Sequence, residues 1–219
     1  MLQRHALALL LTLPSATALA APAQYALDPV HTRVLFAIEH AGFSKALGTV
    51  SGSSGTLVFD PDDWTSARLQ AQVPLQRLDL GDEKWNRAAL ARNLLDGERY
   101  PEARFVSTRI EPIDATHARV FGELSLHGVS REIALEVTLN ALKRHPLPPF
   151  RRTVGFSATA TLQRADFGID AWPSMIGATV ELRIEAEATR QGRAERDDPA
   201  QAAPTDPPVA PDPTQEPSP

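Results

Sequence analysis

The chain has 219 residues, no cysteine and a formal net charge of −5, with 22 basic against 27 acidic side chains. The absence of cysteine excludes disulfides, thiolate metal sites and thiol nucleophiles. Basic and acidic side chains nearly balance between residues 21 and 190, so we expect no basic surface of the kind that nucleic acids require.

The first twenty residues have the pattern of a secretory signal peptide. Arg4 and His5 give a basic start, residues 6–13 form an apolar run, and residues 18–20 have the small-x-small pattern of a cleavage site. The apolar run is too short for a membrane span, which needs about 20 residues. We therefore expect residues 1–20 to direct export to the periplasm, and we expect no membrane-spanning segment in the mature protein.

The other end of the chain, residues 191–219, is rich in proline and acidic residues and nearly devoid of large apolar side chains. Such a segment does not bury enough apolar surface to offset its loss of conformational entropy, so we expect it to stay disordered. A single folded domain is therefore expected over residues 21–190.

Within this domain, apolar and polar residues alternate in segment after segment, which is the pattern of a strand with one buried face. In residues 178–188, Val180, Leu182 and Ile184 share one face, whereas Glu181 and Arg183 share the other. In chain order, strands are expected at 25–28, 33–40, 56–59, 66–75, 103–111, 118–127, 131–141, 153–163 and 178–188.

The connections between these strands carry turn and helix signals. A Gly/Ser cluster covers residues 48–55, and Gly128 is expected to supply a positive φ in a tight hairpin. Between residues 82 and 95 the period of two disappears, and Asp82 is placed to cap a short helical connection.

About eight strands with one apolar face each predict an all-β fold, either an antiparallel barrel or a sandwich. A barrel of eight strands is wide enough to hold one small ligand. Several inward positions are small, among them Ala67, Ala71, Gly122 and Ala158. Small side chains either leave room for a ligand or let a tapering barrel close on itself, and the pattern alone does not separate these alternatives.

Catalytic and metal-binding motifs are absent: the sequence has no nucleophile elbow, phosphate-binding loop, dinucleotide fingerprint or zinc-binding helix. His31 and His40 lie nine residues apart, about 30 Å along a strand, which is too far for a shared metal ion. The segment 164–169 is interpreted as a structural corner in which Arg164 and Asp166 hold loops.

Taken together, six segments in order resemble the YceI family of exported lipid-binding proteins. One of them, Gly-Glu-Leu-Ser-Leu-His-Gly-Val-Ser-Arg, is similar to the family hairpin G-x-L-x-L-x-G-V-[ST]-[RK]. The chain differs from the family pattern at residues 85–87, where an Asp-rich helical start is frequent, and at residues 177–178, where Gly-Asp is frequent. The segments are 25–31, 34–43, 48–52, 100–107, 122–131 and 164–169.

The resemblance implies a lipocalin-like antiparallel β-barrel whose apolar cavity holds a polyisoprenoid or another long-chain amphiphile. It implies no catalytic residue, no metal site and no cofactor. At the mouth of the cavity, His31, Trp85 and Asn86 are the polar candidates. The candidates for the cavity wall are Val34, Phe36, Ile38, His40, Leu69, Leu124, Leu126, Leu135, Val137, Phe156, Ala158, Val180, Leu182 and Ile184.

Three functions follow from these observations. The favoured one is a periplasmic carrier or buffer for an isoprenoid or other long-chain lipid. The second is a filled barrel, packed by residues such as Phe36 and Phe156, that acts as a stress or interaction module. The third is an enzyme at the barrel mouth that uses His31, His40 or Asp166. A homodimer is compatible with the sequence, which does not specify the oligomeric state or the lipid head group.

Overall fold

The structure is a computed structural model that describes residues 22–192. The expected signal peptide, and the expected tail beyond its first two residues, lie outside the described residues. Within residues 22–192, no helix has the length and apolar character that crossing a bilayer would require.

Strands make up most of the described chain. The strands are β1 (Ala23–Leu27), β2 (Arg33–His40), β3 (Ser44–Ser51), β4 (Ser54–Phe59), β5 (Arg68–Pro74), β6 (Leu78–Asp79), β7 (Glu102–Pro112), β8 (His117–Leu126), β9 (Val129–Arg144), β10 (Arg152–Gln163) and β11 (Ile176–Arg190). The helices are α1 (Glu83–Ala89) and the 3-10 turns η1 (Trp64–Ser66), η2 (Leu75–Arg77) and η3 (Arg164–Phe167).

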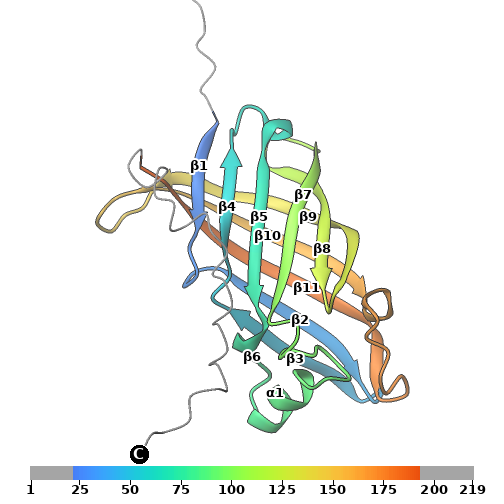
Figure 1. The fold of residues 1–219 in the computed structure, drawn as a ribbon. Coiled ribbons are helices and arrows are strands. Elements are labelled where there is room, and N and C mark those ends of the chain that lie inside the picture. The colour runs from blue at the N-terminus through green and yellow to red at the C-terminus, as the bar shows by residue number, and fades with distance from the viewer. Residues whose placement is uncertain (1–21, 193–219) are drawn as a thin grey trace, which may run out of the picture.

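The sheet closes on itself as an antiparallel barrel (Figure 1). Eight strands form the ring in the order β1-β4-β5-β7-β8-β9-β10-β11, and β11 pairs back onto β1. The long strand β11 also pairs with β2, so β1 and β2 are two halves of one interrupted strand. The all-β prediction and the choice of a barrel are therefore confirmed.

Two of the connections between strands contain residues with positive φ, a conformation that glycine adopts most easily. Gly52, between β3 and β4, has a φ of +79°. After this turn the chain moves away from β3, and β4 pairs with β1 and β5. The hairpin from β8 to β9 has two residues of positive φ, His127 at 53° and Gly128 at 75°. Two consecutive residues of this kind make the turn that fits the twist of a two-residue hairpin.

One side of the barrel is completed by non-strand segments. Strand β6 pairs with β3, and β7 pairs with β5 as far as Pro74. In the chain, α1 and the turns after it connect β6 to β7. Helix α1 begins after Asp82, whose carboxylate accepts hydrogen bonds from the amides of Lys84 and Trp85 at 2.9 and 3.1 Å. The helix ends at Ala89, earlier than the expected helical connection, and turns follow.

The end of the barrel opposite α1 is filled by aromatic side chains. The rings of Phe59, Trp64 and Phe156 meet edge to face, with centroids 5.1 to 6.2 Å apart, an arrangement that aromatic quadrupoles favour. Tyr25 and Val154 are buried in the same cluster. Trp64 belongs to the connection from β4 to β5, which lies at the upper end in Figure 1.

Candidate functional site

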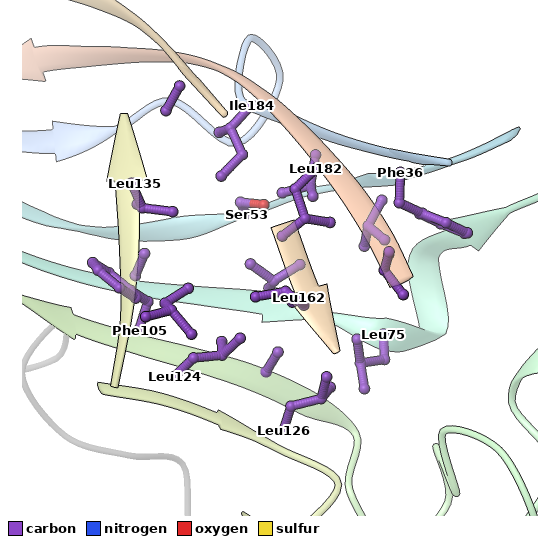
Figure 2. Close-up of a pocket in the computed structure, with 18 of the residues that line it drawn as sticks. Phe36, Ser53, Leu75, Phe105, Leu124, Leu126, Leu135, Leu162, Leu182 and Ile184 are labelled. Atoms are coloured by element: carbon purple, nitrogen blue, oxygen red, sulfur yellow. The ribbon is translucent and has the colours of Figure 1, made fainter. Parts of the chain in front are cut away.

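The barrel encloses an apolar cavity of about 760 Å³ that extends from the aromatic cluster to α1. Its wall is made of alternate residues of the strands, because side chains with the same parity point to the same face. A row of such residues crosses five neighbouring strands in register: Val137, Ala158, Ile184, Val34 and Val50. Figure 2 shows part of this wall, in which the drawn side chains are almost all hydrocarbon.

All of the residues proposed for the cavity wall from the sequence line this cavity. They face inward, as the period of two predicts, and their role in binding a lipid stays a prediction. The filled-barrel alternative required an interior packed by Phe36, Phe156 and the leucines. The structure instead leaves open volume between these side chains.

The three polar candidates for the mouth occupy different environments. Trp85 on α1 lines the cavity, and its ring lies 5.3 Å from the ring of His40, which also lines it. Asn86 does not line the cavity. Its Oδ1 accepts a hydrogen bond from the amide of Leu80 at 2.7 Å, which ties α1 to the residue that follows β6. His31 lies outside the cavity.

The position of His31 is explained by its partner. Its Nδ1 lies 2.8 Å from Oδ2 of Asp28 in the connection between β1 and β2, and the hydrogen bond with this carboxylate raises the pKa of His31. His40 lines the cavity, whereas Asp166 is exposed on η3 and does not line it. The structure thus does not gather His31, His40 and Asp166 into one site.

The cavity opens at the α1 end. Those of its lining residues that are exposed all lie there: Glu39, Trp85, Ala88, Trp172 and Met175. The amide of Ala41 donates a hydrogen bond to the carbonyl of Met175 at 2.7 Å, which joins the β2–β3 hairpin to the segment that carries Trp172. Phe43, at the tip of this hairpin, is 91% exposed, so large apolar side chains surround the mouth.

Arg164 holds one side of this mouth in place. The buried guanidinium donates to the carbonyls of Gly177, Ile169 and Ile176 at 2.8 to 2.9 Å. The carbonyls belong to the two ends of the segment 169–177, so one side chain fixes the loop that carries Trp172. This geometry agrees with the interpretation of Arg164 as a structural corner.

Two phenylalanine rings lie flat against the wall because glycines stand opposite them. A Cβ atom added to Gly48 would lie 2.2 Å from Cζ of Phe36, and one added to Gly122 would lie 2.3 Å from Cζ of Phe105. Real side chains do not approach so closely, so both positions require glycine if the rings keep their places. The sequence signal for this feature is a glycine inside a strand, which often marks a close approach.

The titratable groups with a clear pKa shift lie away from the cavity. Among the described residues, the groups whose pKa is clearly shifted are Asp28, His31, Asp63, Asp79, Asp114 and Glu185. None of these lines the cavity, whereas catalytic groups with shifted pKa values cluster in clefts. In residues 22–192, no group of three or more His, Cys, Asp or Glu side chains is placed to hold a metal ion.

A closed antiparallel barrel of eight strands around an apolar cavity has room for one small hydrophobic ligand. The chain belongs to the YceI-like domain family, whose model matches residues 25–188.

Relatives by sequence and by structure agree with this assignment. A UPF0312 protein of Pseudomonas savastanoi pv. phaseolicola is 33% identical over 171 residues, which are 77% of this chain and 88% of the relative. The crystal structure of Burkholderia cenocepacia BcnA has a TM-score of 0.67 at 22% identity, covering 74% of this chain and 99% of BcnA.

A second solved structure is a polyisoprenoid binding domain from Saccharophagus degradans that is implicated in plant cell wall breakdown. It has a TM-score of 0.56 at 16% identity and covers 76% of this chain and 98% of that domain. At these identities, the likeness to both solved structures shows the shared fold.

Proposed function

We propose that this protein binds a long-chain amphiphilic lipid of the polyisoprenoid type inside the barrel and carries or sequesters it in the periplasm, without catalysis. The observation that carries the proposal is the cavity of about 760 Å³, apolar along its walls and open at the α1 end. Burying one methylene group contributes about 0.8 kcal/mol. A long apolar chain therefore gains affinity from its length alone, without a strong polar contact.

Three further observations support the proposal. The polyisoprenoid binding domain of Saccharophagus degradans has the same fold, and membership of the YceI-like family agrees with a binding role. The periplasmic location is supported by the signal-peptide pattern of residues 1–20.

The direct test is to purify the full-length protein from the periplasm of a cell that produces it and to analyse organic extracts by mass spectrometry. We expect a lipid with an isoprenoid chain at a stoichiometry near one per protein. Extracts that are empty, or that only mirror the composition of the bulk membrane, would contradict the proposal.

A variant that fills the cavity sharpens this test. Ala158 lies on the cavity wall of β10, so Ala158→Phe places a ring in the open volume and should abolish co-purification of lipid. Ala134 on the neighbouring strand β9 does not line the cavity, so Ala134→Phe is a matched control that should retain lipid. Equal lipid content in the two folded variants would contradict binding inside the barrel.

A further inference from the structure

Two buried polar atoms of the cavity wall have no hydrogen-bond partner among residues 22–192. They are Oγ of Ser53 and Nε1 of Trp64, and both residues line the cavity. Ser53 is 2% exposed and Trp64 is 6% exposed. In Figure 2, the Ser53 hydroxyl is the one oxygen among the side chains drawn around the cavity.

This is unusual because buried polar groups are almost always paired. Leaving a buried donor unpaired costs about as much as losing a hydrogen bond. The other buried polar side chains of the wall follow the rule. Oγ1 of Thr32 donates to the carbonyl of Glu187, and the guanidinium of Arg164 donates to three carbonyls.

The two unpaired groups differ in position as well as in chemistry. Trp64 belongs to the aromatic cluster at the closed end of the barrel, where its ring meets Phe59 and Phe156. Ser53 lies at the break between β3 and β4, among the apolar residues that form the wall. A ligand that reaches past the mouth therefore meets hydrogen-bonding groups inside the barrel as well as hydrocarbon.

The chemistry of these groups defines what they recognise. An indole N–H only donates a hydrogen bond, and a hydroxyl both donates and accepts. An oxygen acceptor satisfies either group. A charged ligand group does not fit inside the barrel, because the acidic and basic side chains that line its wall are Glu39, which is exposed at the mouth, and Arg164, whose guanidinium already binds carbonyls. A buried charge without a partner would be costly.

We propose that the ligand carries a neutral oxygen acceptor, such as a carbonyl, ester or hydroxyl oxygen, that enters the barrel and accepts a hydrogen bond from Ser53 or Trp64. This inference rests on the proposed function and narrows its ligand class from any long-chain amphiphile to one whose polar group is a neutral oxygen acceptor that lies inside the barrel. The apolar remainder of such a lipid extends along the wall toward the mouth.

The test uses two probes with the same skeleton: geranylgeranylacetone, whose carbonyl only accepts, and the hydrocarbon in which a methylene replaces that carbonyl. Dissociation constants are measured by calorimetry on full-length mature protein stripped of lipid, with each probe delivered from cyclodextrin. For each probe, the wild type is compared with Ser53→Ala and Trp64→Phe. Solubility differences between the probes cancel in this comparison.

We expect at least one of these substitutions to weaken binding of the ketone about five-fold, the usual effect of one hydrogen bond. The same substitution should leave hydrocarbon binding unchanged or strengthen it, because it removes a polar group that the hydrocarbon leaves unpaired. Ser107→Ala is the matched control. Oγ of Ser107 accepts a hydrogen bond from the amide of Leu69 outside the cavity lining, so it should lower thermal stability without changing the ratio of the two affinities.

The outcomes separate this inference from the proposed function. If both probes bind and neither substitution changes their ratio, the acceptor inference is overturned while the lipid-binding proposal stands. Water molecules that hydrogen-bond to Ser53 and Trp64 both with and without a bound ligand would give this result. If neither probe binds to the folded wild type, the proposed function itself is overturned. Should Trp64→Phe fail to fold, Ser53→Ala still tests the hydroxyl, which has no hydrogen-bond partner among residues 22–192. The indole is then tested by its N–H resonance in the wild type, which should shift on binding of the ketone and not of the hydrocarbon; an unchanged resonance together with an unchanged ratio in Ser53→Ala overturns the inference.

Discussion

The ring of Phe36 on β2 lies directly over the α-carbon of its register partner on β3, Gly48. Phe105 on β7 lies over Gly122 on β8 at a similar distance, although Gly122 is the register partner of Ser107. In both places the glycine lets a large ring lie along the wall instead of projecting into the lumen. The open volume of the barrel therefore depends on residues that have no side chain.

This relationship predicts that Gly48→Ala destabilises the protein. The added methyl group would lie 2.2 Å from Cζ of Phe36, so the ring must leave the wall, and overpacking of this kind costs about 1–3 kcal/mol. The free energy of unfolding is measured by urea titration. Gly155→Ala on β10 is the matched control, since its added methyl group would meet nothing closer than the carbonyl oxygen of Ala186 at 4.0 Å. Equal stability of the two variants would contradict the argument.

The hydrogen bonds of Arg164 lead to a second prediction. Lysine retains the charge but cannot reach the carbonyls of Ile169, Ile176 and Gly177 at once. Because hydrogen bonds from charged groups are worth about 1.5–3 kcal/mol each, Arg164→Lys should lower the free energy of unfolding by about 2–4 kcal/mol. It should also make the segment 169–177 more sensitive to limited proteolysis.

The control for this experiment is Arg183→Lys. Arg183 is exposed and its guanidinium binds Glu185 on the surface of β11, an arrangement worth at most about 1 kcal/mol. If Arg164→Lys is no less stable than Arg183→Lys and is cleaved no faster, the buried guanidinium does not hold the loop.

A pH-dependent contribution to stability is expected from Asp114, in the turn between β7 and β8. The amide of Thr116, followed by the side chain of His117, lowers the pKa of Asp114 from 3.8 to about 2. A carboxylate with a depressed pKa stabilises the folded state above its unfolded pKa, and this contribution is lost as the pH falls from about 4 toward 2.

Thermal unfolding of the wild type and Asp114→Ala should therefore differ at neutral pH and converge as the pH approaches 2. Asp114→Asn keeps an oxygen acceptor for the turn but has no charge to titrate. Its melting temperature should therefore lie closer to that of the wild type than the melting temperature of Asp114→Ala does at neutral pH, and this smaller difference should also shrink toward pH 2. A constant gap between the wild type and Asp114→Ala down to pH 2 would refute the assignment.

Alternation along the strands was sufficient to predict an all-β fold and its inward faces, because a period of two fixes the side on which every residue lies. The choice of a barrel over a sandwich came from the family resemblance. Strand β3 was missed, since Gly48 and the serines around it read as a turn. In the structure Gly48 belongs to a strand because the ring of Phe36 fills the space where its side chain would be. That compensation comes from another strand, so no local pattern reveals it.

The mouth was harder to predict than the wall for a related reason. Asn86 and His31 are polar residues near strand ends, but each is engaged by a neighbour that the sequence does not single out, Leu80 and Asp28 respectively. Trp172 and Met175 reach the mouth because Arg164 fixes the loop that carries them. Such placements depend on tertiary hydrogen bonds, which a period of hydrophobicity does not encode.

Helix α1 provides the last prediction, because it is too short to be stable by itself. A helix of two turns gains little from its own hydrogen bonds, so the bonds from Lys84 and Trp85 to the Asp82 carboxylate should matter. Asp82→Ala should cost about 1 kcal/mol and increase hydrogen exchange at the amides of these two residues. Because Trp85 lines the mouth beside His40, bound geranylgeranylacetone should also dissociate faster.

The control is Glu83→Ala, which removes an exposed ion pair with Arg87 worth roughly 0.3–0.5 kcal/mol and leaves the cap intact. Faster exchange in Asp82→Ala with unchanged release of the probe would show that Trp85 does not obstruct the mouth. Faster release in both variants alike would mean that surface charge, rather than the position of the helix, sets the rate. Only a change specific to Asp82→Ala in both measurements agrees with α1 as part of the path by which the ligand leaves the barrel.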